Sequence, residues 1–233
     1  MTEEIKLLVD VEVKLIDSMA SDISVTRSAQ VSVKGENKPG TDTPRLINYL
    51  MSARHGSPFE HSTFTWFVKA PIFVFREFHR HRIASYNEMS GRYTELLPEF
   101  YMPRGERPLI NVGTSARPEF ESGDEMMYAD LQELVIESYV TAWDNYRSLL
   151  DLGVANEVAR MVLPVGIMSQ MYVTINARSL MNFLSLRIDS PDASVRTRPQ
   201  YEIQLVAEKM EQDFKNLMPH TWEAWNTNGR VAP

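Results

Sequence analysis

Hydrophobic and polar positions change their spacing along the chain in a way that predicts both strands and helices. Residues 7–15 alternate between apolar and polar side chains, which predicts a first strand with one apolar face. That face carries Leu7, Val9, Val11, Val13 and Leu15. Residues 62–69 and 170–177 are rich in β-branched and aromatic side chains, so they predict strands, and the first of these should be substantially buried. A short strand is expected at residues 99–102.

Apolar residues recur at helical spacing in seven further segments. The longest predicted helix spans residues 124–152 and ends at Gly153. The other helices are expected at residues 22–31, 44–54, 155–163, 178–187 and 200–217, with a short one from residue 72. Ser21 and Thr43 are predicted N-caps, and Gly56 is a predicted left-handed C-cap. Ile23, Val25 and Ala29 should form the buried stripe of the first helix.

Clusters of Gly, Pro, Asn and Asp separate these segments and predict loops. The loops are expected at residues 34–41, 57–61, 87–91 and 189–199, whereas residues 103–123 are turn-prone and are assigned no fixed structure. Because strands and helices interleave with short connections, we expect an α+β fold, with a mixed or antiparallel sheet packed with helices. The pattern does not determine which strands pair.

Composition favours one domain over residues 1–233, because this length is sufficient for a sizeable core. The chain is 43% hydrophobic and 24% charged, as in ordinary globular proteins. It has no cysteine, and this excludes disulfides, thiolate metal sites and thiol nucleophiles.

A formal net charge of −7 argues against general binding to nucleic acids, so any anion must meet a local cluster of cations. The sequence contains no apolar stretch of the roughly 20 residues that a membrane-spanning helix needs. It begins without a basic segment and a signal core, so we expect a cytoplasmic protein with no membrane partner.

Residues 80–93 combine permanent cations with small hydrogen-bonding groups and one carboxylate. Guanidinium groups bind phosphate through two parallel donors, and Gly91 permits close approach of a backbone amide, so a nucleotide phosphate is a reasonable ligand. The alternative is that these arginines form surface ion pairs with some of the 31 acidic residues. The residue types alone do not decide between the two interpretations.

Two arginines in the predicted helix 178–187 should face different ways. Arg178 and Asn182 are four positions apart, so both can address one ligand. Arg187 follows Arg178 by nine positions, about two and a half turns at roughly 3.6 residues per turn. It should therefore meet a different group or lie where the helix ends, although a solvated face is an equally simple interpretation.

The run from Arg80 to Tyr93 resembles the signature RHRxxSxx(E/Q)xSxRY of the flavin-dependent thymidylate synthases and matches it at every specified position. Further similarity to that family lies in residues 57–61 (SPFEH), 157–160 (EVAR) and 176–184 (NARSLMNFL), followed by Arg187. The resemblance extends from about residue 21 to residue 204. It implies a homotetramer whose active sites are shared between subunits.

The resemblance assigns two sets of binding residues. FAD is expected against Ser32, Ser57, Arg80, His81, Arg82, Glu88, Asn176, Arg178 and Asn182. The substrate dUMP is expected against Glu77, Arg80, Glu88, Met89, Ser90, Gly91, Arg92, Arg160 and Arg187. No metal is expected.

The resemblance also implies the reaction. NADPH reduces FAD, methylenetetrahydrofolate supplies a carbon, and dUMP becomes dTMP. A cysteine nucleophile, used by the other class of thymidylate synthase, is impossible in this chain. A fixed cation suits the charge that develops on the uracil ring, so Arg187 is the expected catalytic residue. Ser90 as a replacement nucleophile would need an activating base, so we interpret it as a nucleotide contact.

Two other functions are compatible with parts of the sequence. His55, His61, His79 and His81 could include metal ligands, but the neighbouring arginines would repel a cation. A nucleotide-binding or RNA-binding module could use the same arginines, with Tyr86 or Tyr93 stacking on bases. The acidic balance of the chain argues against this module.

The chain departs from the family pattern at two places. Glu77 stands where other members can have Gln, which alters the hydrogen-bonding polarity toward dUMP. After Asp189 and Ser190, many members have His, whereas this chain has Pro191 and an apparent insertion that reaches about Arg198. The flavin contact of that His is therefore not assigned.

Overall fold

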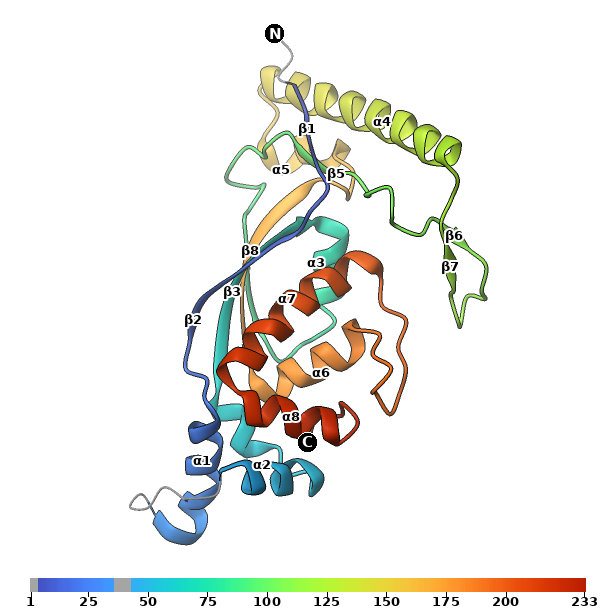
Figure 1. Cartoon of the computed structure of the whole chain (residues 1–233). Helices are drawn as coiled ribbons and strands as arrows, with labels where there is room; N and C mark the ends of the chain where they lie inside the picture. Colours follow the sequence, from blue (N-terminus) through green and yellow to red (C-terminus); the bar gives the residue numbers. More distant parts are fainter. Residues whose placement is uncertain (1–3, 36–42) are drawn as a thin grey trace. The chain divides into compact units, whose positions relative to one another are not determined.

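The computed structural model describes residues 4–35 and 43–233 (Figure 1). Helices and strands are both present, so the predicted α+β class is confirmed. The described residues form two compact units, and each is treated separately below. Within the described residues, unit 1 comprises residues 4–11, 69–78 and 88–171, and unit 2 comprises residues 12–35, 43–68, 79–87 and 172–233. One domain over residues 1–233 stays a prediction.

Unit 1 is built around its long helix. It contains β1 (Lys6–Leu8), α3 (Ile72–Phe78), β5 (Glu99–Tyr101), β6 (Ile110–Asn111), β7 (Phe120–Glu121), α4 (Glu125–Asp151), α5 (Asn156–Ala159) and the 3₁₀ helix η3 (Arg160–Val162). Strands β1 and β5 pair in parallel, and β6 and β7 pair antiparallel. Asp124 caps α4 by accepting from Met127 N, and Gly153, at φ +81°, follows its end as predicted.

Aromatic side chains form the core of unit 1. Phe100 stacks on Tyr139 with ring centroids 4.6 Å apart, and Trp143 and Tyr146 follow on the same helix. Tyr139 Oη donates to Tyr101 O at 2.9 Å, and Tyr146 Oη accepts from Leu96 N at 3.1 Å. These bonds satisfy the polar ends of buried rings.

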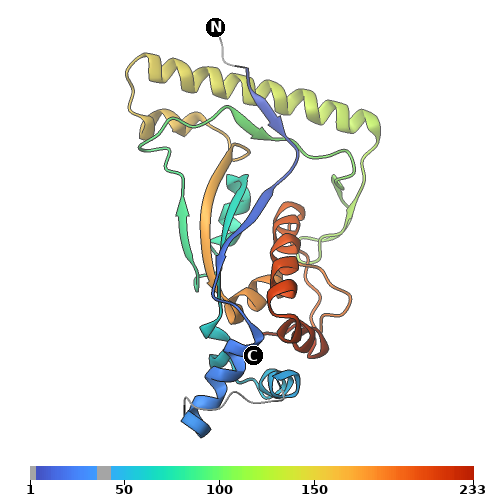
Figure 2. The ribbon, with the colours of Figure 1, turned by 60° about the vertical axis from the view of Figure 1, so that its left-hand side comes forward.

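Unit 2 combines a sheet with helices. It contains β2 (Glu12–Ser18), α1 (Asp22–Lys34), α2 (Thr43–Ser52), the 3₁₀ helix η2 (Ser57–His61), α6 (Ala177–Arg187), α7 (Tyr201–Leu217) and α8 (Pro219–Thr227), with most of β4 (Ser85–Glu88). Strands β3 (Thr63–Pro71) and β8 (Met168–Asn176) contribute residues to both units. The sheet has the order β2-β3-β8-β4, and Figure 2 shows β4 beside β8.

The core of unit 2 lies between this sheet and helix α7. Phe64 stacks on Trp66 at 5.1 Å and meets Phe214 of α7 edge-on at 6.1 Å. Trp66 Nε1 donates to Asp213 at 2.8 Å, and Thr65 and Thr174 share a hydrogen bond between their hydroxyls. The strands predicted at residues 62–69 and 170–177 are therefore confirmed.

Several local predictions were wrong. Residues 7–15 form two strands because β1 pairs with β5 and β2 belongs to the other sheet. Ile23 is 55% exposed, whereas Val25 is buried as expected. Residues 85–88, partly predicted as loop, form β4, and residues 57–61 form η2. The helix predicted at residues 155–163 is divided into α5 and η3. Residues 103–123, to which no structure was assigned, contain the β6–β7 hairpin.

Gly56 is not a left-handed cap, because it has φ −77° and precedes η2. Arg54 takes the left-handed conformation instead, with φ +61°. The backbone explains the change: Arg54 N bonds Met51 O and His55 N bonds Leu50 O, so helix α2 ends before Gly56. The loop predicted at residues 34–41 falls largely outside the described residues.

Helix α8 was missed, and its first turn explains why. The preceding residue, Met218, makes no side-chain cap. The buried carboxylate of Asp22, from α1, accepts from His220 N, Thr221 N and Thr221 Oγ1 at 2.6–2.9 Å.

Among the described helices, none is both long and apolar enough to cross a membrane.

Candidate functional site

The signature run passes from unit 2 to unit 1 after Asn87. The residues predicted for FAD lie in unit 2, except Glu88. Those predicted for dUMP lie in unit 1, except Arg80 and Arg187. Each half of the candidate site is therefore described within its own unit.

Arg80 and Arg82, on the segment after α3, are exposed cations in unit 2. Neither has an ion-pair partner within residues 4–35 and 43–233. The alternative of surface ion pairs is therefore not supported for these two arginines. Arg92 differs, because its Nε donates to Glu157 Oε2 at 2.9 Å.

His81 and Arg187 form a hydrogen-bonded pair in unit 2. Arg187, the last residue of α6, donates from Nε to Nε2 of His81 at 3.1 Å. Burial and the nearby Arg187 charge lower the pKa of His81 from 6.5 to about 4, so the imidazole is neutral at pH 7 and accepts this bond. The ring also meets Phe183 edge-on at 4.9 Å. Arg187 thus has a fixed orientation at a helix C-terminus, where a cation is favoured.

Arg178, near the start of the same helix, contacts a different set of residues. Its Nη1 donates to Glu60 Oε1 at 2.6 Å, and its Nε donates to the main-chain oxygen of Pro233 at 2.7 Å. Gly56 lies against it, because a Cβ at this position would be 2.5 Å from Arg178 Nε. The different partners of Arg178 and Arg187 agree with the phases predicted for the helix.

Four other residues predicted for flavin lie at identifiable places in unit 2. Asn176 caps α6, with Oδ1 accepting from Ser179 N at 2.9 Å. Asn182 is exposed on α6, and Ser57 begins η2. Ser32 is exposed on α1, where its hydroxyl donates to Ala29 O at 3.1 Å. Their contacts with FAD stay predictions.

Gly91 and Arg160 come together in unit 1. A Cβ at Gly91 would lie 3.2 Å from Arg160 Cδ and 3.2 Å from a methyl group of Leu96. Glycine therefore lets the Arg160 side chain pack across the signature backbone. The Arg160 side chain is exposed, and it has no ion-pair partner in the described part of the chain.

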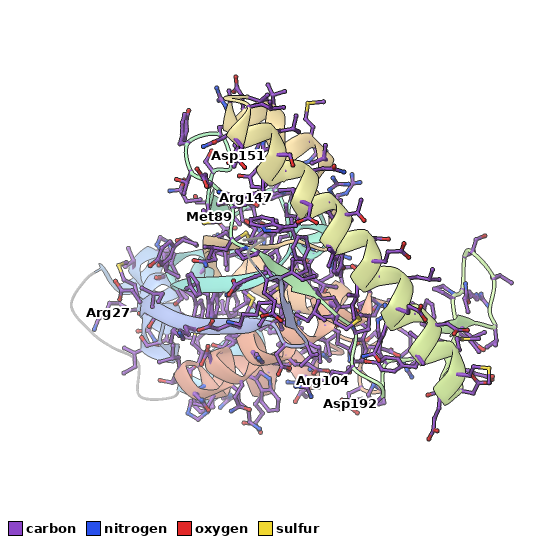
Figure 3. The ribbon with its side chains drawn as sticks, turned by 90° about the horizontal axis from the view of Figure 1, so that it is seen from above. Arg27, Met89, Arg104, Arg147, Asp151 and Asp192 are labelled. Carbon is purple, nitrogen blue, oxygen red and sulfur yellow. The ribbon has the colours of Figure 1, made fainter. Side chains whose placement is uncertain are left out.

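Hydrogen bonds join the segment 88–90 to the start of β8. Ser169 Oγ donates to Glu88 Oε1 at 2.7 Å, and Met89 N bonds Gln170 O at 2.8 Å. The Met89 side chain packs on the aromatic core of unit 1, and Figure 3 shows it near the part of α4 that carries Arg147 and Asp151. Ser90 Oγ accepts from Arg92 N at 3.3 Å, a turn contact that provides no activating base.

The two places where the chain departs from the family pattern lie in different units. Glu77 is half-buried near the end of α3, in unit 1. In unit 2, Arg196 donates twice to Asp189, at 2.6 and 2.8 Å, and Arg198 donates to it at 3.3 Å. Ser194 N also bonds Gly229 O at 2.9 Å. The loop predicted at residues 189–199 is therefore held by specific bonds.

His79 and the histidine and tyrosines of the signature have protein partners. His79 meets the Tyr86 ring edge-on at 5.2 Å, and Tyr86 Oη donates to His81 O at 2.8 Å. Burial raises the pKa of Tyr86 to about 12. Tyr93 is 77% exposed, with the guanidinium of Arg92 over its ring. In the part of the chain that the structure describes, no three His, Asp or Glu residues are grouped to hold a metal.

Two contributions to these contacts were not predicted: Ser169 as the partner of Glu88, and Glu60 as the partner of Arg178. Glu60 belongs to a motif noted above, so its carboxylate was a visible candidate partner for an arginine. Ser169 gave no signal, because it is a single serine in an apolar strand and lies 81 positions from Glu88. Gly56 was interpreted as a helix cap. Its lack of a side chain instead lets the Arg178 side chain pack against the backbone.

Comparison with known proteins shows similarity to one family along nearly the whole chain. The sequence model of the family described as "Thymidylate synthase complementing protein" matches residues 14–220. A protein named flavin-dependent thymidylate synthase from Tropheryma whipplei (strain TW08/27) is 49% identical over 97% of this chain and 96% of its own. One of the same name from Streptomyces avermitilis is 50% identical, covering 96% and 94% of the two chains.

A solved structure also resembles this chain. It is a UMP/dUMP methylase, PolB, from Streptomyces cacaoi, bound with 5-bromo-UMP. It superposes with a TM-score of 0.93 and 45% identity, covering 98% of this chain and 99% of the other. A second structure of that methylase, bound with 5-bromo-dUMP, has the same TM-score.

Proposed function

This chain belongs to the thymidylate synthase complementing protein family, and from that premise we propose that it is a flavin-dependent thymidylate synthase, which converts dUMP to dTMP. The observation that carries the proposal is the likeness, over nearly the whole chain, to a methylase solved with brominated uridine nucleotides. The absence of cysteine supports the flavin route, because the alternative route needs a thiol nucleophile.

On the nucleotide side, the proposal assigns a specific task to each group in unit 1. Arg160 and Arg92 are exposed guanidinium groups that suit a phosphate. Gly91 lets the signature backbone approach Arg160 closely. Glu88 keeps one carboxylate oxygen on Ser169, and the other is an acceptor for an N–H or O–H of the nucleotide.

On the flavin side, the donor set of unit 2 fits a dinucleotide. Arg80 and Arg82 are cations without ion-pair partners among the described residues, which suits a pyrophosphate. Glu60 and Pro233 O hold Arg178 beside Ser57, and Asn182 lies on the same helix. FAD bound there would supply the reducing equivalent for the reaction.

Arg187 is the proposed catalytic cation. Its permanent charge would stabilise negative charge that develops on the uracil ring, and a preorganised cation does this without rearranging during the reaction. The neutral His81 imidazole accepts from Arg187 Nε and adds no negative charge of its own. His81 therefore orients Arg187 without neutralising it.

Other parts of the proposal come from the family resemblance. They are NADPH as the reductant of FAD, methylenetetrahydrofolate as the carbon donor, a homotetramer with shared active sites, and a cytoplasmic location. None of them depends on a contact described above.

The decisive experiment is an assay of dTMP formation from dUMP, methylenetetrahydrofolate and NADPH, with and without FAD. We expect a yellow protein whose colour NADPH bleaches, and dTMP only when FAD is present. Colourless protein that takes up no FAD and forms no dTMP would contradict the proposal. Equal dTMP formation in flavin-free protein would contradict the flavin route alone.

A further inference from the structure

Ser169 is a buried serine with one identified partner, the Glu88 carboxylate. The residue is 2% exposed and lies on β8 between the buried Met168 and the half-buried Gln170. A buried hydroxyl without a partner costs about 1–3 kcal/mol, so a serine at this position calls for an explanation. Its Oγ–H donates to Glu88 Oε1 at 2.7 Å, which satisfies the hydroxyl.

This bond has the geometry of a strong, charge-assisted interaction. Hydroxyl-to-carboxylate bonds are short and roughly twice as strong as bonds between neutral groups. The adjacent bond from Met89 N to Gln170 O, at 2.8 Å, fixes the backbone at the same place. Together the two bonds restrict both the main chain and the side chain of Glu88. The carboxylate is otherwise exposed and could adopt several rotamers.

We propose that Ser169 is a positioning residue, whose buried hydroxyl holds Oε1 of Glu88 so that Oε2 is presented to the uridine nucleotide. The inference rests on the proposed function, because Glu88 is expected to contact dUMP. Ser169 itself touches neither substrate nor flavin. Its effect on binding therefore passes through Glu88, and dUMP affinity should depend on a hydroxyl that lies behind the site.

The test compares Ser169→Ala with wild type by calorimetric titration of dUMP into the FAD-loaded protein. We expect the Kd for dUMP to rise roughly tenfold, the change that about 1.4 kcal/mol produces. FAD content should match that of Ser62→Ala. Ser62 is a suitable control because its hydroxyl is buried and has no hydrogen-bond partner among the described residues. Ser169→Thr, which retains the hydroxyl, should restore binding.

A double-mutant cycle separates positioning from a merely structural role. In a Glu88→Ala background, Ser169→Ala should cause no further loss of dUMP affinity. Additive losses would overturn the proposal, and so would wild-type dUMP binding by Ser169→Ala. If Ser169→Ala does not fold, Ser169→Cys replaces it, since a thiol is only a weak donor and should also raise Kd. Wild-type binding by a folded Ser169→Cys would likewise overturn it.

The outcome for wild type distinguishes the two proposals. Wild-type protein that binds no dUMP and forms no dTMP would refute the proposed function itself. Active wild type with an unaffected Ser169→Ala would refute only the positioning role.

Discussion

Arg178 and Arg187 lie on one helix but have different partners, and helix geometry explains the difference. Arg178 contacts Glu60 and Pro233 O near the start of α6, whereas Arg187 contacts His81 at its end. Arg178 has a carboxylate partner in Glu60. Arg187 donates to the neutral imidazole of His81, which orients a cation that we propose stabilises charge on the substrate.

Replacing Arg187 tests that role. Arg187→Ala should lower kcat by roughly 100-fold or more, the cost of removing one preorganised donor in other enzymes, while FAD content is retained. Arg187→Lys should recover part of the rate, because it keeps the charge but loses the planar fork. Arg45→Ala, on an exposed part of α2, is the control for loss of an arginine. Wild-type kcat in Arg187→Ala would exclude the catalytic assignment.

The lowered pKa of His81 predicts a pH dependence of stability. The pKa in the folded protein is about 4, below the ordinary 6.5, so as pH falls the unfolded chain takes up this proton first. The contribution of this pKa difference to the free energy of unfolding is fully present above pH 6.5. It is lost as the pH falls from 6.5 to about 4. Urea titrations at several pH values should show a smaller decrease for His81→Gln than for wild type.

Measurements at pH 8 provide the reference for that comparison, since His81 is neutral there in both the folded and the unfolded chain. The difference at pH 8 reports the loss of the imidazole itself. Identical pH dependence in the two proteins would mean that His81 is not the group that titrates.

At the residue scale, the sequence predicted candidate residues better than their partners. Arg80–Tyr93 could be recognised because its chemistry is concentrated in one short run. The His81–Arg187 bond joins residues 106 positions apart, and the Ser169–Glu88 bond spans 81. No local pattern encodes such a pairing, because folding alone brings these groups together.

At the element scale, helix caps separate the successful predictions from the failures. Ser21 and Asp124 precede the helices that they cap, so local sequence predicted the starts of α1 and α4. Helix α8 has no local side-chain cap, and Asp22 supplies one from 198 positions away. Similarly, residues 7–15 alternate as one strand, but their partners divide them into two.

Removing the distant cap should destabilise unit 2. Asp22→Ala would leave the Thr221 N–H and hydroxyl without their buried acceptor, at a cost of roughly 2–3 kcal/mol in the free energy of unfolding. Urea denaturation followed by tryptophan fluorescence would measure it, since Trp222 and Trp225 lie on α8. Ser21→Ala, which removes the local cap of α1, should cost about 1 kcal/mol. Equal costs for the two variants would argue against the capping of α8 by Asp22.

At the scale of the whole molecule, the family resemblance predicts four chains with shared sites. Light scattering after size exclusion should give the mass of a tetramer, and dTMP formation should follow that peak. Dilution that dissociates the tetramer should abolish turnover, because each site would lose residues from a neighbouring subunit. A monomer with the full rate per chain would refute shared sites.

The two compact units are interleaved along the polypeptide. The chain passes between them after residues 11, 68, 78, 87 and 171, so neither unit is one continuous stretch. The gene therefore cannot be cut at one point to yield either half of the candidate site as a separate product. Domain grafting or split-enzyme designs that suit modular proteins will not suit this one. New binding specificity would have to be built by point substitution within the intact chain.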